Sequence, residues 1–235
     1  MKVSVCIATY NGEKYINEQL DSILKQLGED DEIIISDDSS SDRTVQLVNQ
    51  YNDKRIKVIL NQVFKNAIFN FENALKYASG DLIFLSDQDD IWVDGRVKHM
   101  VEELKKVDMV VCDHCVINDN KDVLIDSYFK NIPSQPGIIK NLLKSTYYGC
   151  CMAFRKEILV KALPFPKDIP MHDIWLGFVA DMYFKASFIN VVYTMYRKHD
   201  KNVSIATELK SNNSLITKLK YRINTIKYLP LLMSR

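Results

Sequence analysis

Short apolar runs alternate with amphipathic stretches over the first half of the chain. The runs are rich in β-branched side chains, as expected for buried strands. The stretches between them repeat apolar side chains three and four positions apart, which is the spacing of one helix face. This β-α-β-α order predicts an α/β fold with a central, mainly parallel mixed sheet flanked by helices. We expect strands at residues 3–8, 32–36, 56–60, 82–85 and 109–112, and helices at 14–26, after the capping residues 39–42, at 67–78 and at 95–106.

The alternation weakens after about residue 113. Residues 118–135 are polar and contain turn residues, so we expect an irregular connection there. A buried helix is expected at 171–184 with Asp173 near its start, a strand at 189–196, and a last helix at 215–229. No repeat, low-complexity segment or clear linker divides the chain.

Length, charge and cysteine content limit the class of protein. A chain of 235 residues that is 47% apolar can form one sizeable core, and a net charge of +1 gives no field that would attract nucleic acid. Five cysteines, an odd number, do not suggest a disulfide framework, and the pair Cys112 and Cys115 has no second pair to complete a zinc site. The first apolar run ends at Ala8, short of a signal peptide, and no apolar stretch approaches the roughly 20 residues that span a bilayer. We therefore expect a protein of the reducing cytoplasm.

Three carboxylates, Asp87, Asp89 and Asp90, crowd the end of the apolar run 82–85. Like charges this close raise each other's pKa, so a fold keeps such a cluster where a cation neutralises it. Asp87 and Asp89 are two positions apart and face the same way on an extended chain. Carboxylate oxygens suit Mg²⁺ or Mn²⁺, which commonly bind one or two carboxylates together with substrate phosphates. The cluster favours transfer from a diphosphate-bearing donor, although an Asp-rich turn would give the same local pattern.

Polar residues also follow the first two predicted strands, at 8–12 and at 37–40. In a doubly wound sheet these strand ends meet the carboxylate cluster at one rim. A nucleotide fits such a rim, because Tyr10 can stack on a base, worth roughly 1–3 kcal/mol, and Asp38 can accept the imide N–H of uracil or thymine. Each residue alone has an ordinary explanation, Asp38 in a helix cap and Tyr10 at the edge of the core. Their coincidence at three strand ends favours the nucleotide site.

Five segments carry motifs that are specific in combination. Residues 5–12 are a strand with a Tyr-Asn turn, residues 37–44 fit Asp-Asp-x-Ser-x-Asp-x-Thr after the apolar Ile34 and Ile35, and residues 84–92 read Phe-Leu-Ser-Asp-Gln-Asp-Asp-Ile-Trp. Residues 149–154 read Gly-Cys-Cys-Met-Ala-Phe and residues 172–175 read His-Asp-Ile-Trp. Over residues 2–205 the chain resembles the inverting glycosyltransferases of family 2, which have the GT-A fold, and in particular a bacterial branch that includes many rhamnosyltransferases. It departs from that branch at Cys151, where threonine is usual, and it is shorter than many members.

The resemblance implies that a sugar moves from a nucleoside diphosphate to an acceptor hydroxyl with inversion at the anomeric carbon. It places the general base on Asp173, and a helix N-terminus at that position stabilises a carboxylate. It also places the basic stretch 197–202 against the diphosphate, where Arg197 can clamp a phosphate and His199 can reach the metal or a phosphate. A solvated basic loop is the alternative for this stretch.

The candidate residues are grouped by role. The predicted catalytic base is Asp173. The predicted donor-binding residues are Ala8, Thr9, Tyr10, Asn11, Glu13, Asp37, Asp38, Asp87 and Arg197. The predicted ligands of Mn²⁺ or Mg²⁺ are Asp87, Asp89 and His199, and the predicted acceptor-side residues are Gly149, Cys150, His172 and Trp175. We expect a GT-A domain at 1–205, with a nucleotide-binding half at 1–113 and an acceptor-side half at 114–205.

The resemblance also suggests substrates and a location. It favours a dTDP-linked rhamnose donor, with a UDP-hexose as the alternative, and a saccharide acceptor, in many members lipid-linked, in bacterial surface polysaccharide synthesis. The predicted location is the cytoplasm, with peripheral contact at the inner face of the cell membrane.

The tail at 206–235 is predicted to be a basic amphipathic helix. From residue 215 onward every charged side chain is basic, and apolar residues recur at helical spacing. Such a helix can lie on an anionic membrane or pack on the main domain, and the sequence leaves both open.

Other functions remain as alternatives. A nucleotidyltransferase would share the scaffold and the metal, but the turn 10–14 has one glycine and an acid where such enzymes carry a Gly-rich basic loop. A non-catalytic nucleotide-sugar-binding module would be expected to lack Asp89 or Asp173, and both are present. A Rossmann dehydrogenase is disfavoured because no Gly-x-Gly-x-x-Gly follows the first strand.

Overall fold

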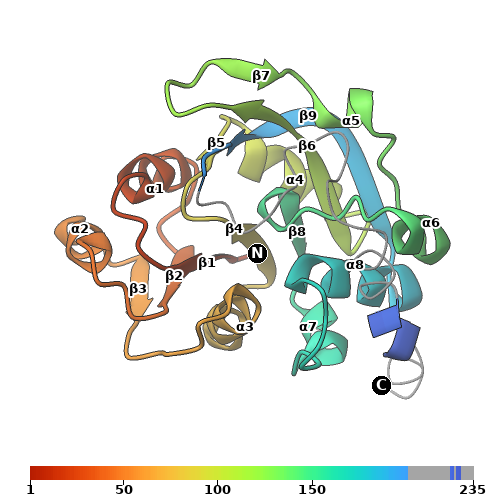
Figure 1. The fold of residues 1–235 in the computed structure, drawn as a ribbon, viewed down its shortest axis with the longest axis horizontal. Coiled ribbons are helices and arrows are strands. Elements are labelled where there is room, and N and C mark those ends of the chain that lie inside the picture. The colour runs from red at the N-terminus through yellow and green to blue at the C-terminus, as the bar shows by residue number, and fades with distance from the viewer. Residues whose placement is uncertain (201–222, 225, 229–235) are drawn as a thin grey trace.

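One mixed sheet runs through the described part of the chain, which in this computed structural model comprises residues 1–200, 223–224 and 226–228. The strand order is β3-β2-β1-β4-β8-β6-β9-β5, and β7 pairs with β6 (Figure 1). The strands are β1 (Val3–Thr9), β2 (Glu32–Asp37), β3 (Ile56–Ile59), β4 (Leu82–Ser86), β5 (Ile91–Trp92), β6 (Met109–Ile117), β7 (Val123–Ile125), β8 (Met152–Arg155) and β9 (Ala186–Arg197). The helices are α1 (Ile16–Leu24), α2 (Thr44–Gln50), α3 (Ala67–Tyr77), α4 (Arg96–Glu103), α5 (Tyr128–Asn131), α6 (Ile138–Leu143), α7 (Glu157–Ala162) and α8 (His172–Tyr183), with a 3₁₀ turn η1 (Gly149–Cys151).

The first four strands form the parallel part of the sheet. β1 pairs with β2 and β4, and β2 pairs with β3, all in parallel. Every residue of β2 and β4 is buried, which explains why these strands appear in the sequence as continuous apolar runs rather than as alternating ones. Thr9 lies opposite Asp37, and Ile7 lies opposite Ser86. The carboxyl ends of β1, β2 and β4 therefore reach the same edge of the sheet, and the predicted fold class is confirmed.

The second half of the chain completes the sheet largely by antiparallel pairing. β8 runs antiparallel to both β4 and β6, so that η1, immediately before β8, lies beside the end of β4. Several short elements were not predicted, among them β5, β7 and α5. β7 and α5 occur within 118–135, where we expected an irregular connection, and β5 is a strand of two residues whose pairing with β9 defines it. Segments this short have too few residues to show a periodic pattern. The strands β5 and β7 are defined instead by their pairing with β9 and β6.

Helices cover the sheet and connect its two halves. α3 packs on β1 and β2, and α7 and α6 both pack on α8 (Figure 1). No helix within the described residues is both long and apolar enough to cross a membrane. The division into halves at residue 113 stays a prediction.

The predicted tail helix at 215–229 lies mostly outside the described residues, as does most of 206–235. The described tail residues contact the main domain. Lys227 Nζ lies 3.1 Å from Asp168 Oδ2, Asn224 donates to the Asp168 carbonyl at 3.2 Å, and the Tyr228 ring lies edge-on to Trp175.

Replacement of Gly177 by alanine should destabilise the fold. Gly177 is buried in α8, and an added Cβ would overlap the ring of Tyr147, whose hydroxyl donates to Asp181 at 2.7 Å and so holds the ring in place. We expect the free energy of unfolding to fall by about 1–3 kcal/mol, measured by urea denaturation. Gly28→Ala is the matched control, because its Cβ would meet only Asp31 Oδ2 at 3.5 Å. Equal stability of the two variants would contradict this account of the packing between α8 and the segment before η1.

Candidate active site

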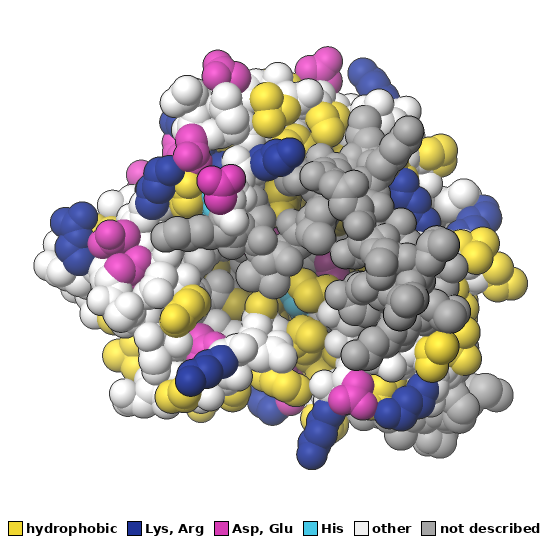
Figure 2. Space-filling model, viewed as in Figure 1, with side chains coloured by type: hydrophobic (Ala, Val, Ile, Leu, Met, Phe, Trp, Pro, Cys, Tyr) yellow, Lys and Arg dark blue, Asp and Glu magenta, His cyan; other side chains and the backbone are white. Residues whose placement is uncertain are grey.

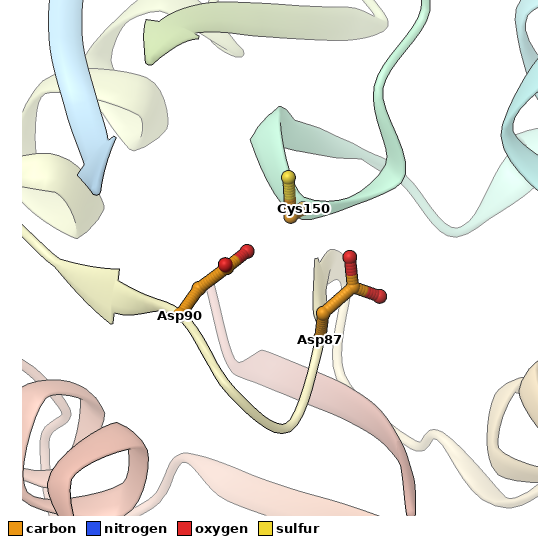
Figure 3. A group of neighbouring side chains, drawn as sticks. All are labelled: Asp87, Asp90 and Cys150. Atoms are coloured by element: carbon orange, nitrogen blue, oxygen red, sulfur yellow. The ribbon is translucent and has the colours of Figure 1, made fainter. Parts of the chain in front are cut away.

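The connection between β4 and β5 places three carboxylates at the edge where β1 and β2 also end. β4 ends at Ser86 and β5 begins at Ile91, so Asp87, Asp89 and Asp90 occupy a turn too short to carry them apart. Asp87 and Asp90 point toward Cys150 on η1, and the potential ligand atoms of these three residues lie within 4.8 Å of one another (Figure 3). The antiparallel pairing of β4 with β8 brings Cys150 here.

The electrostatics of this cluster favour a bound cation. Burial raises the pKa of Asp87 well above its usual range, the charges of Asp89 and Asp173 raise it further, and the charge of Arg96 lowers it. Burial, followed by the charges of Asp89 and Asp87, also raises the pKa of Asp90 well above its usual range. The guanidinium of Arg96 is fully buried, lies over the Trp92 ring at 4.1 Å and donates to the Thr194 hydroxyl at 2.6 Å. The charge of Arg96 offsets only part of the negative charge of the carboxylates and leaves an excess for a cation to neutralise.

The donor set fits a divalent ion. Asp90 Oδ1 accepts the backbone N–H of Arg197 at 3.0 Å, whereas Asp90 Oδ2 is buried and has no hydrogen-bond partner among the described residues. A buried carboxylate oxygen without a partner is costly, and a metal ion would satisfy it. Asp87 and Asp90 supply hard oxygen ligands of the kind that Mg²⁺ and Mn²⁺ prefer, and the Cys150 sulfur adds a softer one.

The predicted metal ligands Asp87, Asp89 and His199 are close together in the structure but fall into two groups. His199 Nε2 lies 2.8 Å from Asp89 Oδ2, and its ring stacks on Tyr15 at 5.0 Å. Asp87 instead belongs to the group with Asp90 and Cys150. No local pattern favoured Asp90 over Asp89 as a ligand, because the burial of Asp90 depends on the pairing of β5 with β9.

Arg197, which ends β9, lies against the same turn. Its Nε donates to the carbonyl of Asp89 at 2.9 Å, and its guanidinium forms an ion pair with Glu18. The side chain is almost fully buried, because only 1% of the residue is exposed. A phosphate clamp by Arg197 would require an exchange of these contacts.

Asp173 stands at the start of α8 with its carboxylate held by backbone groups. Gly149 N–H donates to Asp173 Oδ2 at 3.0 Å, and Ile174 N–H donates to Oδ1 at 2.7 Å. Burial raises the pKa of Asp173 to about 6, while the two N–H groups act in the opposite direction. Its charge raises the pKa of Asp87, so the predicted base and the carboxylate cluster share one site. A carboxylate with this pKa is a competent base near neutral pH.

Gly149 and His172 pack tightly behind this carboxylate. His172 is buried and stacks on Phe71 at 4.0 Å, and burial lowers its pKa to about 3, so the imidazole is neutral. A Cβ at position 149 would lie 2.8 Å from His172 Nε2. Glycine is thus required where the chain passes between His172 and Asp173 and donates its N–H to the carboxylate.

The predicted donor-binding residues after β1 lie at the edge of the sheet. Tyr10 is 58% exposed, and its backbone N–H donates to Gln88 Oε1 at 2.9 Å, so its ring can accept a stacked base. Asn11 has a left-handed backbone conformation, with φ of 49°, and its Oδ1 accepts the N–H of Ser41. The contacts of Tyr10 and Asn11 join the turn after β1 to the ends of β4 and β2.

The other residues of that group have partners within the protein. Asp37 is buried and accepts the Thr9 hydroxyl at 2.8 Å, so this hydrogen bond holds the ends of β1 and β2 together. Ala8 directly precedes Thr9 on β1. Asp38 accepts the backbone N–H groups of Phe64 and Asn66, and Glu13 forms an ion pair with Arg43. The imide N–H of a bound base could therefore donate only to a lone pair of the Asp38 carboxylate that Phe64 and Asn66 leave free.

Trp175 lies in the core rather than at the edge of the site. It is 2% exposed, and its indole N–H donates to the carbonyl of Ala162 at 2.9 Å. Sequence reasoning also missed Gln88, Arg96 and the half-buried Tyr148, whose pKa is raised by burial and by the nearby charge of Asp173. For Arg96 the available signal was a basic residue six positions beyond the last Asp of the cluster.

Comparisons with known proteins agree on one family. The sequence model described as Glycosyl transferase family 2 matches residues 4–163. The UDP-Glc:alpha-D-GlcNAc-diphosphoundecaprenol beta-1,3-glucosyltransferase WfgD of Escherichia coli is 30% identical over 206 residues, which are 86% of this chain and 79% of that protein. The dTDP-rhamnosyl transferase RfbG of Shigella flexneri is 28% identical over 222 residues, covering 83% of this chain and 72% of that protein. The crystal structure of S. aureus TarS 1-349 in complex with UDP is 26% identical with a TM-score of 0.68, and the match covers 84% of this chain but 61% of the solved one.

Proposed function

Because the chain belongs to glycosyl transferase family 2 and has the GT-A fold, we propose that it transfers a hexose from a nucleoside-diphosphate donor to a saccharide acceptor in bacterial polysaccharide synthesis. One observation carries the proposal for the site. Asp173 accepts the N–H of Gly149, and the sulfur of the next residue, Cys150, lies within 4.8 Å of ligand oxygens of Asp87 and Asp90. A base for the acceptor and a group of ligands for the donor's counter-ion thus occupy one site.

In the proposed reaction the acceptor hydroxyl attacks the anomeric carbon while the bond to the diphosphate breaks. Asp173 accepts the proton of that hydroxyl, and the N–H groups of Gly149 and Ile174 keep its carboxylate oriented. Asp87 and Asp90, with Asp89 and His199 beside them, would hold Mg²⁺ or Mn²⁺, whose charge neutralises the leaving diphosphate. The neutral His172 fills the space behind Asp173 and contributes no charge.

We propose a UDP-linked hexose as the donor. The name of WfgD specifies UDP-Glc, and TarS was crystallised with UDP, whereas RfbG, which is less similar, is named for a dTDP-rhamnosyl donor. Uracil and thymine present the same imide edge, so Tyr10 and Asp38, the residues that we propose to bind the base, would accept either one. The nucleotide preference is therefore a direct test of this choice.

We further propose a lipid-linked acceptor and peripheral contact with the membrane through the predicted tail helix at 206–235. The name of WfgD specifies a diphosphoundecaprenol-linked sugar as its acceptor. A chain that adds a sugar to such an acceptor would work at the membrane surface.

A donor panel tests the proposal. UDP, dTDP, GDP and their sugar conjugates are added to the protein with Mn²⁺ or with EDTA, and the melting temperature is followed, since a bound ligand raises apparent stability by mass action. We expect the largest increase with a UDP-hexose and Mn²⁺, together with slow donor hydrolysis that EDTA abolishes. A panel without any nucleotide-dependent shift would reject the transferase assignment, and a shift without hydrolysis or transfer would favour the non-catalytic binding module.

Activity should fall as the pH decreases through about 6. The base must be deprotonated to accept a proton, and the carboxyl of Asp173, with a pKa of about 6, becomes protonated below that pH. We expect log kcat/KM to rise with a slope near one up to about pH 6 and to level off above it. A profile whose acidic limb lies near pH 4 would mean that a solvated carboxylate is the base.

A further inference from the structure

Helix α6 (Ile138–Leu143) exposes two of its four apolar side chains and buries a polar one, while Ile138 and Leu142 are half-buried against the core. Its buried residue is Asn141, which is 3% exposed, whereas Ile139 is 76% and Leu143 64% exposed. Ile139 and Leu143 are four positions apart and therefore lie on one side of the helix. In a surface helix of a globular protein the polar Asn141 would normally face solvent in place of Ile139 and Leu143.

The amide of Asn141 fixes this orientation. Its Nδ2 donates to the carbonyls of Gln135 and Gly137 at 3.0 and 3.1 Å, and its Oδ1 accepts the N–H and the hydroxyl of Thr146 at 2.9 and 3.1 Å. These bonds tie the segments before and after α6 to a single buried side chain. Rotating the helix to bury Ile139 would break them and leave a polar group unsatisfied. The exposure of Ile139 and Leu143 therefore follows from the hydrogen bonds of Asn141.

Basic side chains accompany the exposed apolar ones. Lys140 and Lys144 are exposed, and the segment 127–156 contains five basic residues and no acidic one. Hydrophobic and basic side chains lie side by side at the right edge of the space-filling view, where the ribbon shows α6 (Figures 1 and 2). Apolar residues flanked by lysines are the pattern of a surface that inserts shallowly into an anionic lipid bilayer.

We propose that the α6 face, defined as Ile139, Lys140, Leu143 and Lys144, docks on the surface of an anionic bilayer. A second copy of the chain is a poorer occupant, because a symmetric contact would bring the lysines of both copies together. α6 packs on α8, the helix that begins with His172 and Asp173, so docking there would bring the acceptor-side half to the membrane. The biological purpose rests on the proposed lipid-linked acceptor, whereas bilayer binding itself can be measured without any substrate.

The test is flotation of the full chain with vesicles of phosphatidylcholine alone or containing phosphatidylglycerol. We expect binding only to the anionic vesicles, weakened at least about tenfold by Ile139→Glu, which removes an inserted side chain and adds a negative charge. Leu124→Glu is the matched control, because Leu124 is 52% exposed on β7, away from α6, and the change in charge is the same (Figure 1). The control should stay within about twofold of the wild type, and both variants should keep the wild-type melting temperature.

A second pair of substitutions tests the charges. Lys140→Gln combined with Lys144→Gln should weaken binding to anionic vesicles by about 30-fold, since each lysine near such a surface contributes about a factor of five. No vesicle binding by the wild type, equal binding to neutral vesicles, or equal effects of Ile139→Glu and Leu124→Glu would each overturn the proposal. A dimer in solution that Ile139→Glu dissociates would assign the face to a second copy instead. Donor hydrolysis, measured in parallel without vesicles, reports on the transferase assignment independently.

Discussion

Replacing Asp173 with asparagine is expected to reduce turnover by about 10²–10⁴-fold while the donor affinity changes little. Asparagine has nearly the same shape, but it cannot take a proton from the acceptor, and its single carbonyl oxygen can accept only one of the N–H groups of Gly149 and Ile174, which donate to different oxygens of Asp173. Because burial raises the pKa of Asp173 to about 6, removing the charge favours the folded state and offsets the lost hydrogen bond, so we expect the free energy of unfolding to change by less than about 2 kcal/mol. The measurements are kcat on a saccharide acceptor, the donor dissociation constant and the melting temperature.

The matched control for this variant is Asp168→Asn. Asp168 is a carboxylate of the same half of the chain, is about half exposed, and contacts only tail residues in the described structure. Its replacement should leave kcat within about twofold of the wild type. Near-normal turnover in Asp173→Asn would remove the base from this position, and a large loss of donor affinity would place Asp173 at the donor instead.

Replacing Asp87 with asparagine should lower kcat/KM by at least about 10²-fold, because charge neutralisation of the leaving group is worth several kcal/mol. The loss should appear together with weaker metal binding, measured by titration calorimetry with Mn²⁺ and by donor binding in its presence. Asp87 is half-buried near Asp89, Asp90 and Asp173, whose charges it repels, so the uncharged variant should be at least as stable as the wild type at neutral pH.

Lower activity of Asp87→Asn with undiminished stability would show that Asp87 acts as a metal ligand and not only as a structural residue. Asp94→Asn is the control, because Asp94 lies in the same β5–α4 region, is largely exposed and forms an ion pair only with Lys25. A drop in melting temperature with unchanged metal affinity would show that Asp87 only supports the fold.

Much of the α/β framework could be predicted because its determinants are local. The buried parallel strands β1, β2 and β4 appear as apolar runs within a residue of their observed ends, and the stop at Ser79-Gly80 marks the end of α3. The predicted helices extend beyond the observed ones by at most three residues at either end, because periodicity continues past the last helical hydrogen bond. β5 and β7 could not be predicted, since each depends on a partner strand rather than on its own pattern.

The candidate site was predictable only in outline. The strand-end carboxylates and Asp173 could be found from composition, motif and position. The unsatisfied Oδ2 of Asp90 and the buried guanidinium of Arg96 depend on contacts with β9 and could not. The His-Asp-Ile-Trp motif did not indicate that Trp175 lies in the core, where its indole N–H donates to the carbonyl of Ala162.

The sequence by itself determined where strands end and therefore which polar side chains reach the edge of the sheet, since strand period and turn chemistry involve neighbours along the chain. The tertiary structure alone decided which distant residues meet there. Antiparallel pairing of β4 with β8 places Gly149 against Asp173 and Cys150 against Asp90, and the network around Asn141 keeps Ile139 and Leu143 of α6 exposed. These arrangements depend on contacts between residues far apart in the chain, and no local pattern of hydrophobic and polar positions specifies them.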